Sequence, residues 1–232
     1  MYNNDKRLII LDADGTTIDA FSAIDKTFAH HNMVIGDEES FQKRRHIFKY
    51  LGGLKDFPSN IKKQIGKQSR KQIIQTLTEV YREEAQLYPH IAELIRTLIA
   101  APDVIVGLVT RNITNEPEET LRQLFRRHNV DLDALDFFIH IPVREEKSVQ
   151  FRAARERFNI NPARSYICGD EEKDFLAAID SGMHPFMVSY GFESHKRLTK
   201  KFKVPEEIIS QTSAELSERV LHGLGLNDVV QC

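Results

Sequence analysis

The sequence is poor in cysteine, lacks tryptophan and contains no long apolar run. Its two cysteines, Cys168 and Cys232, are too few for a disulfide framework, so we expect a reducing, cytoplasmic environment. No apolar run approaches the roughly 20 residues that span a bilayer, and the first residues show no secretion-signal pattern. We therefore expect no membrane association.

An excess of charge of one sign is also absent. The chain has 32 basic and 34 acidic residues, a net charge of -2 and a sequence pI of about 6.5. This balance does not favour nucleic acid as a partner, and we expect none. With 232 residues, 41% of them hydrophobic, the chain is long enough for one packed domain that carries a smaller module.

Short apolar runs recur along the chain and alternate with helical patterns. Helical spacing of apolar residues marks 91–99, and a capping box at Thr212–Glu215 opens a last helix that runs to about Gly223. Strands alternating with helices predict an α/β fold, a Rossmann-like parallel sheet covered on both faces. The predicted strands are Arg7–Leu11, Val104–Val109, Phe137–Ile141, Ser165–Cys168 and Pro185–Ser189.

One long segment lacks any convincing strand. Residues 20–89 show only helical patterns, so we predict an inserted all-helical cap domain there and a core domain made of 1–19 and 90–232. Part of the cap, Lys43–Lys71, is strongly basic. These cations either attract an anionic partner or form an ordinary solvated helix face.

Polar side chains follow the predicted strands where each strand ends. Asp12 and Asp14 follow the first strand, Thr110 follows the second, and Asp170 comes after the fourth, with Asp174 close behind. In an open α/β sheet the carboxyl ends of the strands form the ligand-binding edge. We therefore expect these residues, together with Lys147 from a loop, to converge in one crevice.

The chemistry of this set fits phosphoryl transfer. Asp12 is placed to attack and Asp14 to handle a proton, while a third carboxylate from Asp170 completes an all-oxygen cluster that suits Mg²⁺. Lys147 supplies a fixed positive charge and Thr110 a hydroxyl for a group with several negative oxygens. The backbone amides of Gly15 and Thr16 are further candidates for phosphate contact.

Four motifs resemble the haloacid dehalogenase (HAD) superfamily of hydrolases. Leu8–Thr16 resembles the first motif of that family, Val106–Thr110 the second, Lys147 the third and Gly169–Asp174 the fourth. The resemblance covers about residues 6–192, and the insertion between the first two motifs is similar to the helical cap of one subfamily. Leu87–Ile91 is also similar to members related to phosphoglycolate phosphatase.

The resemblance implies a role for each matching residue. It makes Asp12 the nucleophile and Asp14 the group that protonates the leaving oxygen and then activates water. It implies that Asp12, Asp170 and the carbonyl of Asp14 bind Mg²⁺, and that Asp174 orients Lys147 or a metal-bound water. Thr110 would hold the phosphoryl group or the nucleophile. Dehalogenases of the superfamily lack an acid at the position of Asp14, so a phosphoester substrate is favoured.

Other candidates carry less of the pattern. Arg111 and Asn112 follow Thr110 and are candidates for phosphate or substrate contact, and Arg144 is a rival of Lys147. Lys55 follows Gly52–Gly53, where related caps carry a specificity loop, and is a candidate for substrate contact or for the Schiff base of a phosphonatase.

We therefore expect a Mg²⁺-dependent phosphatase, similar to phosphoglycolate phosphatase, that acts on a small phosphorylated metabolite as a monomer or homodimer. Three alternatives stay open. One is a phosphosugar mutase of the same fold, and a second is a phosphonatase with a Schiff-base lysine from the cap. The third is a non-catalytic protein that binds an anion through the basic cap.

Overall fold

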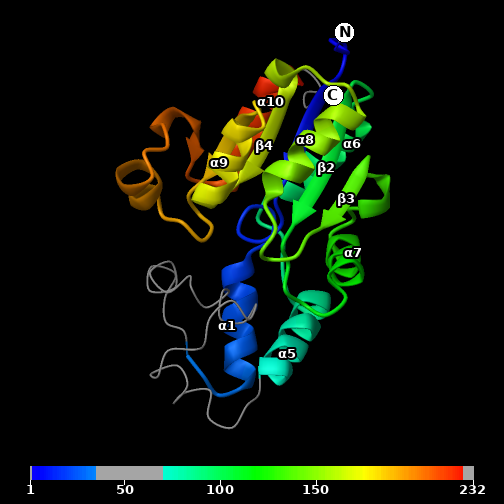
Figure 1. Cartoon of the computed structure of the whole chain (residues 1–232). Coiled ribbons are helices and arrows are strands. Elements are labelled where there is room, and N and C mark those ends of the chain that lie inside the picture. Colours follow the sequence, from blue (N-terminus) through cyan, green and yellow to red (C-terminus); the bar gives the residue numbers. More distant parts are fainter. Residues whose placement is uncertain (1, 35–69, 227–232) are drawn as a thin grey trace.

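The computed structural model describes residues 2–34 and 70–226. Within them a six-stranded sheet has the order β3-β2-β1-β4-β5-β6, and all neighbouring strands are parallel (Figure 1). The strands are β1 Arg7–Leu11, β2 Val104–Thr110, β3 Phe137–His140, β4 Ser165–Gly169, β5 His184–Val188 and β6 Ile209–Ser210.

The α-helices of the described residues follow the strands in the alternation expected from the sequence. None of them is both long and apolar enough to cross a membrane. They are α1 Ala20–His30, α5 Arg70–Glu83, α6 Ile91–Ala100, α7 Pro117–Arg127, α8 Lys147–Arg157, α9 Glu172–Asp180 and α10 Ser213–Gly223.

Both faces of the sheet are covered by helices. Ile9 and Leu11 of β1 join a core that includes α6 and α10, whereas Leu8 and Ile10 join one with α8 and α9. Figure 1 shows α8 and α9 in front of the sheet and α6 and α10 behind it. Since successive side chains of a strand point to opposite faces, a strand buried on both faces reads as a continuous apolar run. This confirms the α/β fold predicted from the sequence.

All five predicted strands exist, with ends that differ by at most one residue. The last helix is also confirmed: the Thr212 hydroxyl accepts from the backbone N–H of Glu215, and α10 ends at Gly223. The short strand β6 was not predicted, because two residues carry no readable periodicity.

Helices α1 and α5 lie side by side beyond the carboxyl ends of the strands, where an inserted module is expected (Figure 1). The division of the chain into a core and a cap of residues 20–89 remains a prediction. Lys55 and all but the end of the basic stretch lie outside the described residues.

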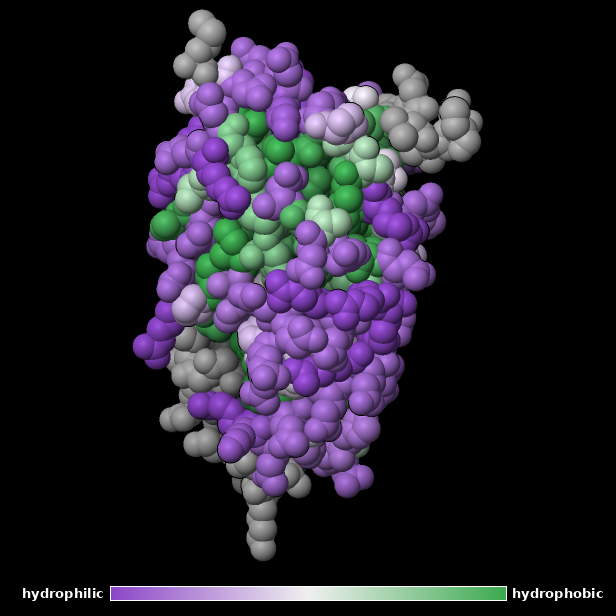
Figure 2. Space-filling model, turned by 90° about the vertical axis from the view of Figure 1, so that its right-hand side faces the viewer, coloured by the Kyte–Doolittle hydropathy of each residue, from purple (hydrophilic) through white to green (hydrophobic). Residues whose placement is uncertain are grey.

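Strand β3 forms one edge of the sheet. On the face seen in Figure 2, hydrophobic residues gather in the upper half of the molecule and are bordered by hydrophilic ones. At this edge the guanidinium of Arg122 lies 5.5 Å from the ring centre of Phe138, and that of Arg157 lies 4.9 Å from that of Phe158. Such stacking covers apolar rings while the charges stay in water.

Candidate active site

Neighbouring strands end level with one another at the edge where the sequence predicts the chemistry. The register pairs Leu11 of β1 with Leu108 of β2 and with Cys168 of β4. The backbone N–H of Asp12, the next residue, donates to the carbonyl of Cys168 at 3.0 Å. This alignment brings Asp12 next to the residues that follow β4, the first of which is Asp170.

The chain turns back sharply after Asp12. Gly15 has a φ of 83°, and its N–H closes the turn on the carbonyl of Ile18 at 3.0 Å. A Cβ built on Gly15 would lie 2.4 Å from Oδ2 of Asp170, so both the conformation and the space require glycine. The hydroxyl of Thr16 donates to the other carboxylate oxygen of Asp170 at 3.2 Å.

The backbone amides of this turn are already engaged. Like the N–H of Gly15, that of Thr16 donates to a carbonyl inside the turn, the one of Ala13, at 3.3 Å. Their predicted contact with phosphate remains a prediction. In the structure, Gly15 and Thr16 both lie against Asp170.

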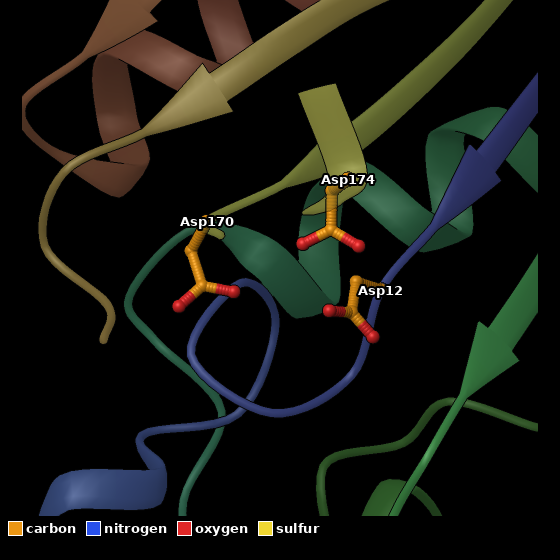
Figure 3. Close-up of side chains that lie close together, drawn as sticks. All are labelled: Asp12, Asp170 and Asp174. Atoms are coloured by element: carbon orange, nitrogen blue, oxygen red, sulfur yellow. The ribbon is translucent and has the colours of Figure 1, made fainter. Parts of the chain in front are cut away.

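Three carboxylates gather at the centre of the site (Figure 3). Asp12, Asp170 and Asp174 each offer an oxygen, and these oxygens all lie within 4.8 Å of one another. No other group of three potential metal ligands exists among residues 2–34 and 70–226. A compact donor set made only of carboxylate oxygens fits a hard divalent cation such as Mg²⁺ rather than zinc.

Burial makes these negative charges costly. Asp170 is fully buried, and burial together with the charges of Asp12 and Asp174 holds its pKa well above the usual range, although the N–H of Phe192 donates to it at 2.6 Å. Burial also raises the pKa of Asp12 to about 7, against the opposing effect of Lys147. An added cation would relieve this cost.

Lys147, the first residue of α8, supplies the positive charge of the site. Its ammonium lies 2.6 Å from Asp12 and 2.7 Å from Asp174, and the three side chains are 5%, 12% and 3% exposed in the order Lys147, Asp12, Asp174. Burial opposes the lysine charge, but the two carboxylates outweigh it and raise the pKa of Lys147. Asp174 is itself fixed, because its other oxygen accepts from the N–H of Glu171 at 3.1 Å.

Asp14 is held separately from the carboxylate cluster. The phenol of Tyr81, on α5, donates to its Oδ1 at 2.7 Å, and the amide of Asn112 lies 3.1 Å from both of its oxygens. Burial raises the pKa of Asp14, while these two donors lower it. Burial and the nearby Asp14 raise the pKa of Tyr81 well above its usual range.

Thr110 and Asn112 form a rigid corner at the end of β2. Both are buried, and the hydroxyl of Thr110 accepts from the N–H of Asn112 at 3.1 Å. The carbonyl of Asn112 lies 3.0 Å from the ring nitrogen Nε2 of His140 on β3. Through the side-chain amide of Asn112, this segment after β2 contacts the carboxyl group of Asp14.

Of the remaining candidates, Arg111 and Arg144 line a cavity of about 260 Å³ that Lys147 also lines. Among the residues that the structure describes, the buried Nε of Arg111 has no hydrogen-bond partner. Arg144 is exposed in the wall of the same cavity, whereas Lys147 reaches Asp12, which favours Lys147 over its rival. Lys55 lies outside the described residues.

Sequence reasoning missed three residues of this site. Tyr81 occupies an ordinary core position of an amphipathic helix with Ile73 and Leu77, so nothing local marks its hydroxyl. The loop after β5 brings Phe192 to Asp170, and the Tyr190 hydroxyl to the carbonyl of Thr16 at 3.0 Å. The sequence offered a signal only for the Tyr190–Phe192 segment. It directly follows the fifth predicted strand, and residues after strand ends lie at the ligand-binding edge of the sheet.

A parallel sheet with a buried lysine and three clustered carboxylates beyond the carboxyl ends of its strands is typical of α/β enzymes that act on phosphate groups. Residues 9–188, more than half of the chain, match the family described as haloacid dehalogenase-like hydrolase. The chain belongs to this family, as the four motifs indicated.

Individual proteins are similar over nearly the whole chain. A phosphoglycolate phosphatase of Vibrio vulnificus (strain YJ016) is 20% identical over 237 residues, which cover 95% of this chain and 99% of that one. CbbY from Rhodobacter sphaeroides, solved with phosphate, has a TM-score of 0.61 and 19% identity, covering 91% of this chain and 96% of its own.

A Thermotoga maritima structure described as a beta-phosphoglucomutase has a TM-score of 0.63 and 16% identity, covering 93% of this chain and 99% of its own. Likenesses at these identities establish the fold. They are equally compatible with hydrolysis and with transfer of the phosphoryl group to a sugar.

Proposed function

We propose that this hydrolase is a Mg²⁺-dependent phosphatase, similar to phosphoglycolate phosphatase, that cleaves a small phosphomonoester through an aspartyl phosphate on Asp12. The observation that carries the proposal is the buried ammonium of Lys147, 2.6 Å from Asp12 and 2.7 Å from Asp174. It is a fixed positive charge beside the carboxylate that would accept the phosphoryl group, as charge-neutralising phosphoryl transfer requires.

Asp12 and Asp14 lie in different surroundings, and each would have a different role in the reaction. An oxygen of Asp12 bonds to phosphorus while the bond from phosphorus to the leaving oxygen breaks, and the proton of the Asp14 carboxyl group passes to that oxygen. Water then attacks the phosphorus of the aspartyl phosphate, ionised Asp14 takes its proton, and inorganic phosphate leaves Asp12. Lys147 neutralises negative charge during both steps, and Thr110 holds the phosphoryl group or the nucleophile.

Asp12, Asp170 and the carbonyl of Asp14 would hold Mg²⁺, with Asp174 beside it. When bound, the ion withdraws charge from phosphoryl oxygens and steadies the acidic cluster. The carboxylate set and the raised pKa of Asp170 support this assignment.

The substrate class is a small phosphorylated metabolite. The relative from Vibrio vulnificus, a phosphoglycolate phosphatase, supports 2-phosphoglycolate as the first compound to test. Arg111 and Asn112, at the end of β2, and Lys55 are candidates for substrate contact. The structural likeness to a protein described as a mutase keeps phosphosugar transfer as a second candidate.

The test is phosphate release from a panel that contains 2-phosphoglycolate, sugar phosphates and nucleotides, with Mg²⁺ or with EDTA. We expect turnover of at least one compound, its loss in EDTA, and a decrease of at least about a thousandfold in Asp12→Asn. Asp5→Asn, which removes an exposed carboxylate just before β1, is the matched control and should keep full activity.

Transfer of the phosphoryl group to a sugar instead of water would identify the mutase. Absence of turnover in folded protein, with tight binding of a macromolecular anion, would support the non-catalytic alternative. Equal activity of Asp12→Asn and the unmodified protein would overturn the assignment of the nucleophile.

A further inference from the structure

Asp14 receives a hydrogen bond from one of the helices beyond the sheet. The donor is Tyr81 on α5, which is fully buried, and its hydroxyl lies 2.7 Å from Oδ1 of Asp14. The two residues are 67 positions apart in the sequence. A phenylalanine would fill the same apolar space, so packing alone does not require the hydroxyl group.

The second donor to Asp14 has a fixed orientation. The side-chain carbonyl of Asn112 accepts from the backbone N–H of Thr114 at 3.0 Å and from the Thr114 hydroxyl. Because an N–H can only donate, the amide nitrogen of Asn112 must be the end that faces Asp14. Tyr81 on α5 and Asn112 after β2 therefore both hold the carboxyl group of Asp14 by hydrogen bonds.

The part of α5 around Tyr81 is also held in place. The guanidinium of Arg127, on α7, donates to the backbone carbonyl of Tyr81 at 3.3 Å. The next residue of α5, Arg82, donates to the hydroxyl of Thr120 at 3.1 Å and to Glu116 at 2.8 Å. Contacts with α7 thus fix α5 at the level of Tyr81, so its hydroxyl is held at a defined place above the sheet.

We propose that Tyr81 is a positioning residue, whose hydroxyl fixes the Asp14 carboxyl group in the orientation that delivers its proton to the leaving oxygen. This inference rests on the proposed phosphatase function. In the step concerned, the bond from phosphorus to the leaving oxygen breaks, the bond to Asp12 forms, and the proton moves from Asp14 to the leaving oxygen. Misplacing a proton donor slows this step without weakening substrate binding.

The leaving group separates this role from a merely structural one. An alkoxide is a poor leaving group and needs the proton, whereas p-nitrophenolate leaves readily without one. We expect Tyr81→Phe to lower kcat for an alkyl phosphomonoester by about tenfold, and kcat for p-nitrophenyl phosphate by less than about threefold. KM for both substrates should stay nearly unchanged. The ratio of the two kcat values does not depend on the folded fraction, so partial misfolding cannot mimic the effect.

Two further variants complete the experiment. Thr78→Val removes another buried hydroxyl from α5, one that donates to the Ile74 carbonyl and accepts from the N–H of Asn115, and does not contact Asp14. It should leave the ratio of the two kcat values unchanged. In an Asp14→Asn background, Tyr81→Phe should have no additional effect on that ratio, because a residue that acts through Asp14 has nothing left to position.

An equal loss on both substrates, no loss on either, or a changed ratio in Thr78→Val would overturn the positioning role while leaving the phosphatase assignment intact. Failure of the unmodified protein to hydrolyse any phosphomonoester with Mg²⁺ would remove the phosphatase assignment, and the role of Tyr81 with it.

Discussion

A Cβ atom placed on Gly191 would lie 2.4 Å from Oδ2 of Asp170. The same Cβ would lie 2.3 Å from the carbonyl oxygen of Gly15, so two glycines from distant segments make room for one buried carboxylate. The N–H of Phe192 completes the contact with Asp170 at 2.6 Å. The loop after β5 thereby sets the position of a proposed metal ligand.

Gly191→Ala should therefore weaken Mg²⁺ binding. The added methyl group must displace Asp170 or the turn at Gly15, and such disturbance of the surroundings of a ligand typically costs 10–100-fold, so we expect about tenfold. Calorimetric titration with Mg²⁺ and the concentration for half-maximal activity measure the effect. Ser189→Ala, in the same loop but directed at the Ser210 carbonyl, is the control. An unchanged Mg²⁺ affinity would argue against Asp170 as a ligand.

Lys147→Met should destabilise the metal-free protein at neutral pH. The substitution leaves Asp12 and Asp174 buried without their cation, and removing one partner of a buried ion pair costs about 3–5 kcal/mol. Protonation of the carboxylates lowers this cost, so about 3 kcal/mol of unfolding free energy is the expected loss, measured by urea denaturation. Lys173→Met, at an exposed lysine on α9, should change the stability little. Equal stabilities of the two variants would contradict the structural importance of the Lys147 contacts.

The glycine of the second motif has a packing role. A Cβ on Gly107 would lie 2.0 Å from the ring of Phe137, the residue paired with it across β2 and β3. Gly107→Ala should lower the unfolding free energy by about 1–3 kcal/mol through overpacking. Phe137→Leu combined with it should recover part of the loss, since the smaller side chain gives space. Additive losses in the double variant would show that the two sites are not coupled.

The sequence was most informative where a local pattern fixes the structure. Leu8–Leu11 is apolar because both faces of β1 are covered, and Asp12 follows because the strand ends at the open edge. The same reasoning placed Asp170 after β4. Since parallel neighbours share one edge, the meeting of Asp12 with Asp170 could be predicted without coordinates.

Contacts made through tertiary packing gave no such signal. Tyr81 lies on a helical face of apolar residues, and only the packing of the folded chain brings its hydroxyl to Asp14. The packing reason for Gly107 was equally hidden, because its partner Phe137 belongs to another strand. Lys147 was predicted from its order among the motifs, but its contact with Asp174 depends on how α8 and α9 pack.

Metal-free protein should lose stability as the pH rises from about 4 to about 7, and Mg²⁺ should reverse the loss. Burial raises the folded-state pKa of Asp12 to about 7 and that of Asp170 well above its usual range, whereas the pKa of an unfolded aspartate is about 3.9. The folded protein therefore binds more protons than the unfolded chain in this interval. Its unfolding free energy is highest below the unfolded-state pKa and falls as the pH rises and these groups ionise.

Thermal denaturation at several pH values, with EDTA or Mg²⁺, measures both effects. In Asp170→Asn the fall should be smaller and the Mg²⁺ stabilisation weaker. A metal-free stability that rises over this interval, or Mg²⁺ stabilisation that does not increase with pH, would contradict the raised pKa values of these buried carboxylates.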